Sequence, residues 1–88
     1  MGLNRKQKKT LKEIFDRPTR PNIRWTDVER LFIAVGAELN EGSGSRVRIR
    51  LNDQVKTFHR PHPGNETKRY SVEAVRRFLR DHGIEPEQ

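Results

Sequence analysis

The 88-residue sequence contains no cysteine, so neither a disulfide framework nor a thiolate zinc site can stabilise the chain. Only 31% of the residues are hydrophobic, and no run approaches the roughly 20 apolar residues that cross a membrane. The N-terminal stretch MGLNRKQKKTLKEIF lacks the apolar segment of a signal peptide. We therefore expect a soluble, cytoplasmic protein without membrane association, whose single small core leaves little room for a large buried cleft.

Acidic residues are the minority among the charged ones. Nineteen Lys and Arg against twelve Asp and Glu give a net charge of +7. Clustered cations release counterions from nucleic acid, so this charge favours a polyanionic partner. Charge alone does not separate RNA, DNA, an acidic protein and a lipid surface, although no predicted helix is both basic on one side and strongly apolar on the other.

Residues 4–15 carry the spacing of an amphipathic helix, with Leu11, Ile14 and Phe15 on one side and lysines around the rest. The prolines of DRPTRP end it. An apolar side of this kind needs a cover, so we expect a helix docked on the edge of the domain rather than a nucleic-acid-binding arm. We divide the chain into this helix with its linker, 1–20, and a main domain, 21–88.

A second helix is predicted in WTDVERLFIAVG, residues 25–36. Thr26 is the expected N-cap, with Glu29 completing a capping box, and Gly36 is the expected end. The expected buried face consists of Val28, Leu31, Phe32 and Val35.

A third helix is predicted in YSVEAVRRFLRDHGI, residues 70–84, capped by Ser71 and closed by a Schellman ending at Gly83 and Ile84. His82 falls in its last turn, where a positive imidazole suits the helix dipole. The apolar stripe consists of Val72, Val75, Phe78 and Leu79.

Between these helices the chain has the pattern of an antiparallel sheet. From Ser45, apolar and basic residues alternate, so the aliphatic residues share one face of a strand and the arginines share the other: Val47, Ile49 and Leu51 against Arg46, Arg48 and Arg50. Asn52 and Asp53 form a plausible two-residue turn, because both residue types tolerate positive φ, and residues 54–59 return as a strand. That register sets Val47 opposite Phe58 and Arg46 opposite His59. Residues 37–39 are the first, short strand.

The predicted fold is α+β: a three-stranded antiparallel sheet with helices on one face and an extra N-terminal helix. One face of such a sheet meets water. The three arginines are expected on that face.

Histidines offer the proton-transfer chemistry near neutral pH. RNA is cut without metal when a base takes the 2′-hydroxyl proton, a cation stabilises the phosphate and an acid protonates the leaving oxygen. His59 and His62 in FHRPHP are candidates, against the alternatives of a surface strand residue and a loop residue. No carboxylate or cysteine cluster completes a metal shell beside them, so we expect neither metal nor cofactor. The EGSGS loop leads into a strand and lacks the lysine of a P-loop.

The stretches VERLFIAVGAEL, GSGSRVRI, FHRPHP and VEAVRRFLRDHGI together resemble the HicA family of toxins from bacterial toxin–antitoxin pairs. The likeness runs from Trp25 to Ile84. It implies a double-stranded-RNA-binding-like fold, ribosome-independent cleavage of mRNA, and neutralisation by a HicB-like antitoxin, with operator DNA reached only indirectly through the antitoxin complex.

The family motif is Gly-Ser-His, with the histidine taken as catalytic, and this chain has Gly44-Ser45-Arg46 there; the Pro-His element matches at Pro61-His62. Arginine binds phosphate but does not serve as a base. Either His59 supplies the imidazole from the neighbouring strand, or the domain binds RNA without cutting it, or the chain is an engineered inactive toxin. The RNA-binding residues expected are Gly44, Ser45, Arg46, Arg48, Arg50, Lys56 and Arg60. In the plainest alternative the arginines only solvate the strand, and the protein works through its partner chain.

Overall fold

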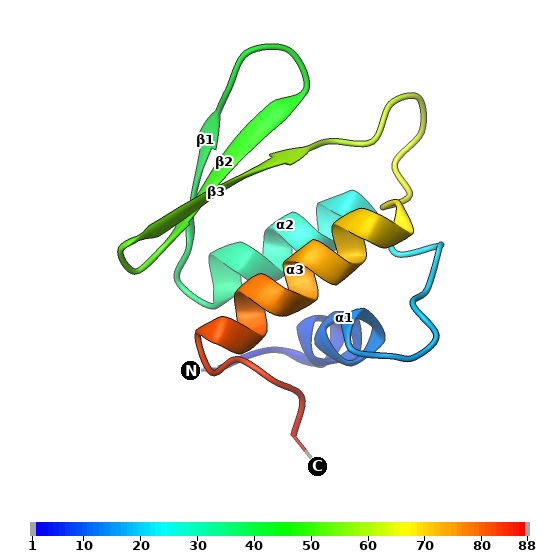
Figure 1. Ribbon diagram of the computed structural model, residues 1–88. Coiled ribbons are helices and arrows are strands. Elements are labelled where there is room, and N and C mark those ends of the chain that lie inside the picture. The colour runs from blue at the N-terminus through cyan, green and yellow to red at the C-terminus, as the bar shows by residue number, and fades with distance from the viewer. Residues whose placement is uncertain (1, 88) are drawn as a thin grey trace.

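The computed structural model describes residues 2–87 and confirms the α+β fold. Three helices lie on one side of a three-stranded antiparallel sheet (Figure 1). In chain order the elements are α1 (Arg5–Ile14), α2 (Trp25–Ala34), β1 (Glu38–Glu41), β2 (Arg46–Leu51), β3 (Gln54–His59) and α3 (Arg69–Asp81). Within residues 2–87, no helix is long and apolar enough to cross a membrane.

The sheet has the order β1-β2-β3, and the predicted register is confirmed. Val47 lies opposite Phe58 and Arg46 opposite His59. Asn52 begins the two-residue turn with a φ of 55°. Along β2 exposed arginines alternate with buried aliphatic residues, so one face of the central strand joins the core and the other meets water.

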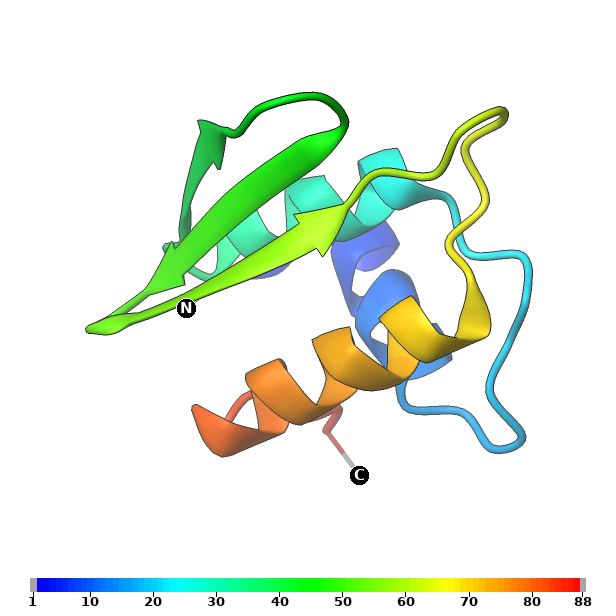
Figure 2. The same ribbon diagram turned by 45° about the horizontal axis from the view of Figure 1, so that its top comes forward.

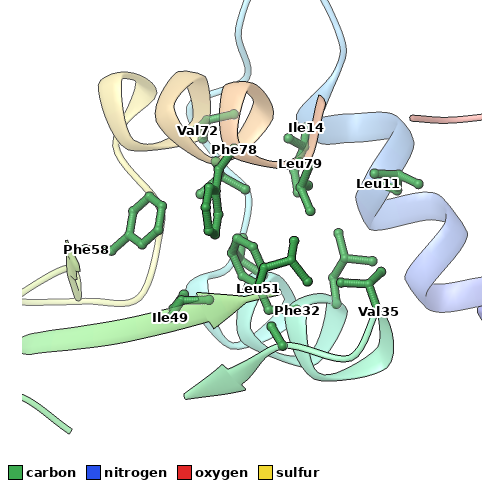
Figure 3. Close-up of a cluster of buried hydrophobic side chains, with 14 of the residues drawn as sticks. Leu11, Ile14, Phe32, Val35, Ile49, Leu51, Phe58, Val72, Phe78 and Leu79 are labelled. Atoms are coloured by element: carbon green, nitrogen blue, oxygen red, sulfur yellow. The ribbon is translucent and has the colours of Figure 1, made fainter. Parts of the chain in front are cut away.

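The core fills the space between the sheet and α2 and α3 (Figure 3). Four aromatic rings lie at its centre, with neighbouring centroids 6.0 to 6.3 Å apart, a separation that suits favourable edge and tilted contacts: Trp25, Phe32, Phe58 and Phe78. The apolar faces predicted for α2 and α3 are all buried.

The N-terminal helix is part of this core. Leu11 and Ile14 of α1 are 5% and 0% exposed, and α1 lies on the side of α2 and α3 away from the sheet (Figure 1). The prediction of a docked helix is confirmed. Asn4 and Gln7 form a capping box at its start, with the Gln7 amide N–H donating to the Asn4 side chain at 2.8 Å.

Arg76 of α3 holds the end of α1 in place. Its guanidinium, on a side chain that is almost fully buried, donates to the carbonyl oxygens of Ile14 (2.8 Å) and Asp16 (3.1 Å) and to the Thr19 hydroxyl (3.0 Å). Burial, and then the charge of Arg17, lower the pKa of Arg76 from its usual value. Carbonyl groups at the end of a helix have no hydrogen-bond donor within that helix, so the guanidinium supplies the donors that α1 lacks there.

Both predicted N-caps are wrong. Helix α2 begins one residue before Thr26, with Arg24 as N-cap and no side-chain cap. The chain stays extended up to Arg24 because that residue bridges Glu66, and the Trp25 amide donates to the Asn65 carbonyl. The Glu29 carboxylate instead accepts hydrogen bonds from the side chains of Trp25 and Arg60, so it forms no capping box.

Likewise, α3 begins at Arg69 with Lys68 as N-cap, so Ser71 lies inside its first turn, buried. The two predicted helix ends are confirmed. Gly36 has a φ of 96°, and the Ile84 amide donates to the Leu79 carbonyl in the expected Schellman ending.

Candidate functional site

The outer face of β2 presents cations to solvent. Arg46, Arg48 and Arg50 are exposed in alternation with buried residues. The Nε of Arg50 lies 3.8 Å from the Oε1 of Glu38 on β1, so these two exposed side chains form an ion pair across the strands. Within residues 2–87, neither Arg46 nor Arg48 forms an ion pair. Two guanidinium groups are therefore available to an anionic ligand.

The glycine turn before β2 packs closely against the strand. Gly44 has a φ of 65°, which favours glycine. At Gly42, an added Cβ would lie 3.1 Å from the Cβ of Arg46, closer than ordinary contact. Beside this turn is a shallow hollow of about 350 Å³, lined by Glu41, Gly42, Ser43, Arg46, Arg48 and Thr57.

A second hollow, of about 430 Å³, lies where the end of β3, the loop 60–68 and the start of α3 meet. His59 comes from the strand and His62 from the loop, so the structure brings the two candidate imidazoles to the same hollow. Within residues 2–87 neither ring forms a hydrogen bond to the protein. The other lining residues are Ser45, Arg60, Pro61, Thr67, Lys68, Tyr70 and Ser71.

Backbone hydrogen bonds hold the loop 60–68 at both ends. The Arg60 amide donates to the Ser45 carbonyl (2.8 Å), which continues the pairing of β2 and β3. The Thr67 amide then donates to the Ile23 carbonyl (2.7 Å). The loop, seen in yellow in Figure 2, is thereby fixed between the sheet and the start of α2.

The Arg60 side chain links three elements through carboxylates. Its Nε donates to Glu29 (2.8 Å), and its two terminal nitrogens donate to Glu41 (2.6 and 2.9 Å). Glu29 also accepts from the Trp25 indole Nε1 (2.6 Å). The hydrogen bonds with Glu41 and then Glu29 raise the pKa of Arg60, and the bond with Arg60 lowers the pKa of Glu41.

A family model described as HicA toxin of bacterial toxin-antitoxin matches residues 25–84. The chain belongs to the HicA toxin family. The matched region begins with α2 and contains the whole sheet, both hollows and α3, whereas α1 lies before it. No curated protein and no solved structure matches the chain.

In this HicA-family chain the cross-strand neighbour of Arg46 on the outer face of the sheet is His59. His62, from the loop 60–68, lines the same hollow as Ser45. One imidazole therefore lies across the sheet from Arg46, and two line the hollow that Ser45 borders.

Two of the predicted RNA-binding residues have other surroundings, whereas a third residue, His82, lies where it is expected. The Arg60 guanidinium is already bonded to two carboxylates. Lys56 pairs with Ile49, on the core side of the sheet, and lies beside Arg77 of α3 rather than with the arginines of β2. His82 is the C-cap of α3, with Nδ1 2.9 Å from the Phe78 carbonyl, as its helix-end role predicts.

Sequence reasoning missed Thr67, Lys68 and Tyr70, which complete the hollow. Tyr70 lies outside the apolar stripe of α3, and an aromatic residue at such a position was the available signal. No sequence signal marks Lys68 or Thr67, because only the folded shape of the loop 60–68 brings them to the hollow. Within residues 2–87, no group of three or more His, Asp or Glu side chains is placed to hold a metal ion.

Proposed function

We propose that this HicA-family toxin is a metal-independent endoribonuclease that cleaves mRNA and is neutralised by a HicB-like antitoxin. The observation that carries the proposal is the meeting of His59 and His62 at one hollow, with Arg46 directly across the sheet from His59. Within residues 2–87 Arg46 and its neighbour Arg48, which line the shallow hollow beside the glycine turn, form no ion pair. A sheet with helices on one face and basic residues on the other also agrees with a double-stranded-RNA-binding-like domain.

In the proposed reaction, one neutral imidazole takes the proton of a ribose 2′-hydroxyl, and the 2′-oxygen attacks the adjacent phosphorus. The bond from phosphorus to the 5′-oxygen breaks, and the second imidazole, protonated, donates its proton to that oxygen. The products are a 2′,3′-cyclic phosphate and a 5′-hydroxyl. Arg46 and Arg48 bind and stabilise the charge on the phosphate.

The test is cleavage of labelled RNA by purified protein with and without EDTA. We expect cleavage in EDTA, and we expect His59→Ala and His62→Ala each to lower the rate by about 10²- to 10⁴-fold, the range for a lost general acid or base. His82→Ala is the matched control, because His82 is used at a helix end. Wild-type rates in both His59 and His62 variants would refute the assignment.

A second candidate function is RNA binding without cleavage, favoured by the arginine in Gly44-Ser45-Arg46. It predicts affinity for RNA without products. For single strands, log K should fall by about 0.7 per phosphate contact for each log unit of salt. Arg46→Ala and Arg48→Ala should each reduce that slope, whereas Arg50→Ala should reduce it less because Glu38 already faces that side chain.

A further inference from the structure

The start of α3 carries an exposed aromatic side chain. Tyr70 is 63% exposed, while four of the other five aromatic residues are buried in the core and Phe15 is partly buried. Within residues 2–87, Tyr70 is therefore the one exposed aromatic ring. Its hydroxyl forms no hydrogen bond to another described residue, so neither packing nor hydrogen bonding within the protein accounts for its position.

Tyr70 lines the same hollow as His59 and His62. The hollow has a volume of about 430 Å³, within the range of pockets that take small organic groups. Lys68 adds a cation at its edge. An aromatic surface, a cation and two imidazoles in one hollow are the groups that would contact one nucleotide of an RNA strand: its base, its phosphate and its ribose.

Thr67 supplies an independent sign of a ligand. It also lines the hollow, it is 1% exposed, and its hydroxyl Oγ1 is the one buried side-chain polar atom of residues 2–87 without a hydrogen-bond partner. Buried polar groups without a partner are uncommon in folded proteins. A hydroxyl donates and accepts, so it can meet either kind of group on the edge of a base.

We propose that Tyr70 and Thr67 form a base subsite: one unstacked RNA base lies on the Tyr70 ring with its edge towards the Thr67 hydroxyl, next to the phosphate between His59 and His62. This inference rests on the proposed ribonuclease function, and it names the residues that select the nucleotide beside the cut. Sequence-specific RNA recognition commonly uses unstacked bases on aromatic side chains, which agrees with a ring presented to solvent.

The test measures binding rather than cleavage. The probes are eight-nucleotide single strands of uridine, cytidine or adenosine with a 2′-O-methyl group on every ribose, which removes the attacking hydroxyl. Tyr70→Ala should raise Kd by about 5- to 150-fold, the loss expected for one stacked base. Tyr70→Phe should keep the wild-type Kd, because the ring remains. Ile33→Ala is the matched control, since Ile33 is 60% exposed on α2 and does not line the hollow.

Thr67→Val keeps the shape of the side chain and removes the hydroxyl. It should change the ratio of Kd values among the three probes by several-fold, while circular dichroism shows an unchanged fold. Equal Kd values for the wild type and Tyr70→Ala on all three probes would overturn the subsite. So would a Tyr70→Ala variant that weakens binding of a HicB-like antitoxin and leaves every RNA probe unaffected, which would assign the ring to a protein interface.

Failure of the subsite and failure of the nuclease are separate outcomes. If the wild type cuts RNA and Tyr70→Ala binds the probes normally, the subsite is wrong and the nuclease stands. If Tyr70→Ala loses binding while His59→Ala and His62→Ala cut RNA like the wild type, the subsite stands and the catalytic assignment is wrong.

Discussion

Replacing Glu29 should destabilise the protein far more than replacing Glu41, although both carboxylates bond to Arg60. Glu29 is 20% exposed as a side chain and accepts two hydrogen bonds, one from Arg60 and one from the buried indole of Trp25. Glu41 is 73% exposed, and its bonds compete with water.

The magnitude follows from what Glu29→Ala leaves behind. The Trp25 indole N–H, in a part-buried bond on a residue that is 3% exposed, loses its acceptor, and an unsatisfied buried donor costs about 1 to 3 kcal/mol. The partly exposed bond to Arg60 adds roughly 1 kcal/mol. The total of about 2 to 4 kcal/mol is a large fraction of the stability of a domain of this size and should lower Tm by roughly 10 to 25 °C.

Thermal unfolding followed by circular dichroism measures the effect. Glu29→Gln should lie between the wild type and Glu29→Ala, because the amide oxygen still accepts from Trp25 while the charge facing Arg60 is lost. Glu41→Ala is the exposed control. Equal Tm values for Glu29→Ala and the wild type, or equal losses in the Glu29 and Glu41 variants, would refute the reasoning.

Two further predictions concern the side chains of Glu41 and Arg76. The lowered pKa of Glu41 means that its stabilising bond with Arg60 is complete above the ordinary pKa of 4.5 and is lost as pH falls through the lower folded-state pKa. The wild type should therefore lose more Tm than Glu41→Gln between pH 5 and pH 3, and parallel losses in melts at both pH values would contradict this. Arg76→Lys should reduce the free energy of unfolding by about 1 to 3 kcal/mol, because one ammonium cannot reach all three oxygens to which the guanidinium donates. Urea titration measures the loss, and an unchanged midpoint would show that these three hydrogen bonds do not stabilise the fold.

The sheet and its register could be predicted from the sequence because they depend on local signals. Alternation at Val47, Ile49 and Leu51 identifies the buried face, and a two-residue turn at Asn52 then determines every cross-strand pair. The pairing of Arg46 with His59 across the strands follows from the alternation and the turn alone.

The starts of α2 and α3 and the second hollow could not be predicted, because they depend on contacts between distant residues. Thr26 has the right chemistry for a cap, but the Asn65 carbonyl, forty positions away from Trp25, takes the first amide instead. The sequence predicts Arg60 as an RNA-binding residue, but the fold brings Glu29 and Glu41 to its guanidinium, which donates hydrogen bonds to both. Propensity describes a residue beside its neighbours in sequence, and tertiary contacts override it.

The main-chain bonds that fix the loop 60–68 have a consequence for how this toxin diversifies. The bonds at Arg60 and Thr67 use amides and carbonyls, which every residue except proline provides in full. Apart from Gly64, whose φ of 87° favours glycine, the exposed residues between them can therefore be substituted without loss of these bonds. Under the proposed ribonuclease function, the hollow would then be a frame in which substitutions on this loop change the preferred RNA sequence at little cost to folding.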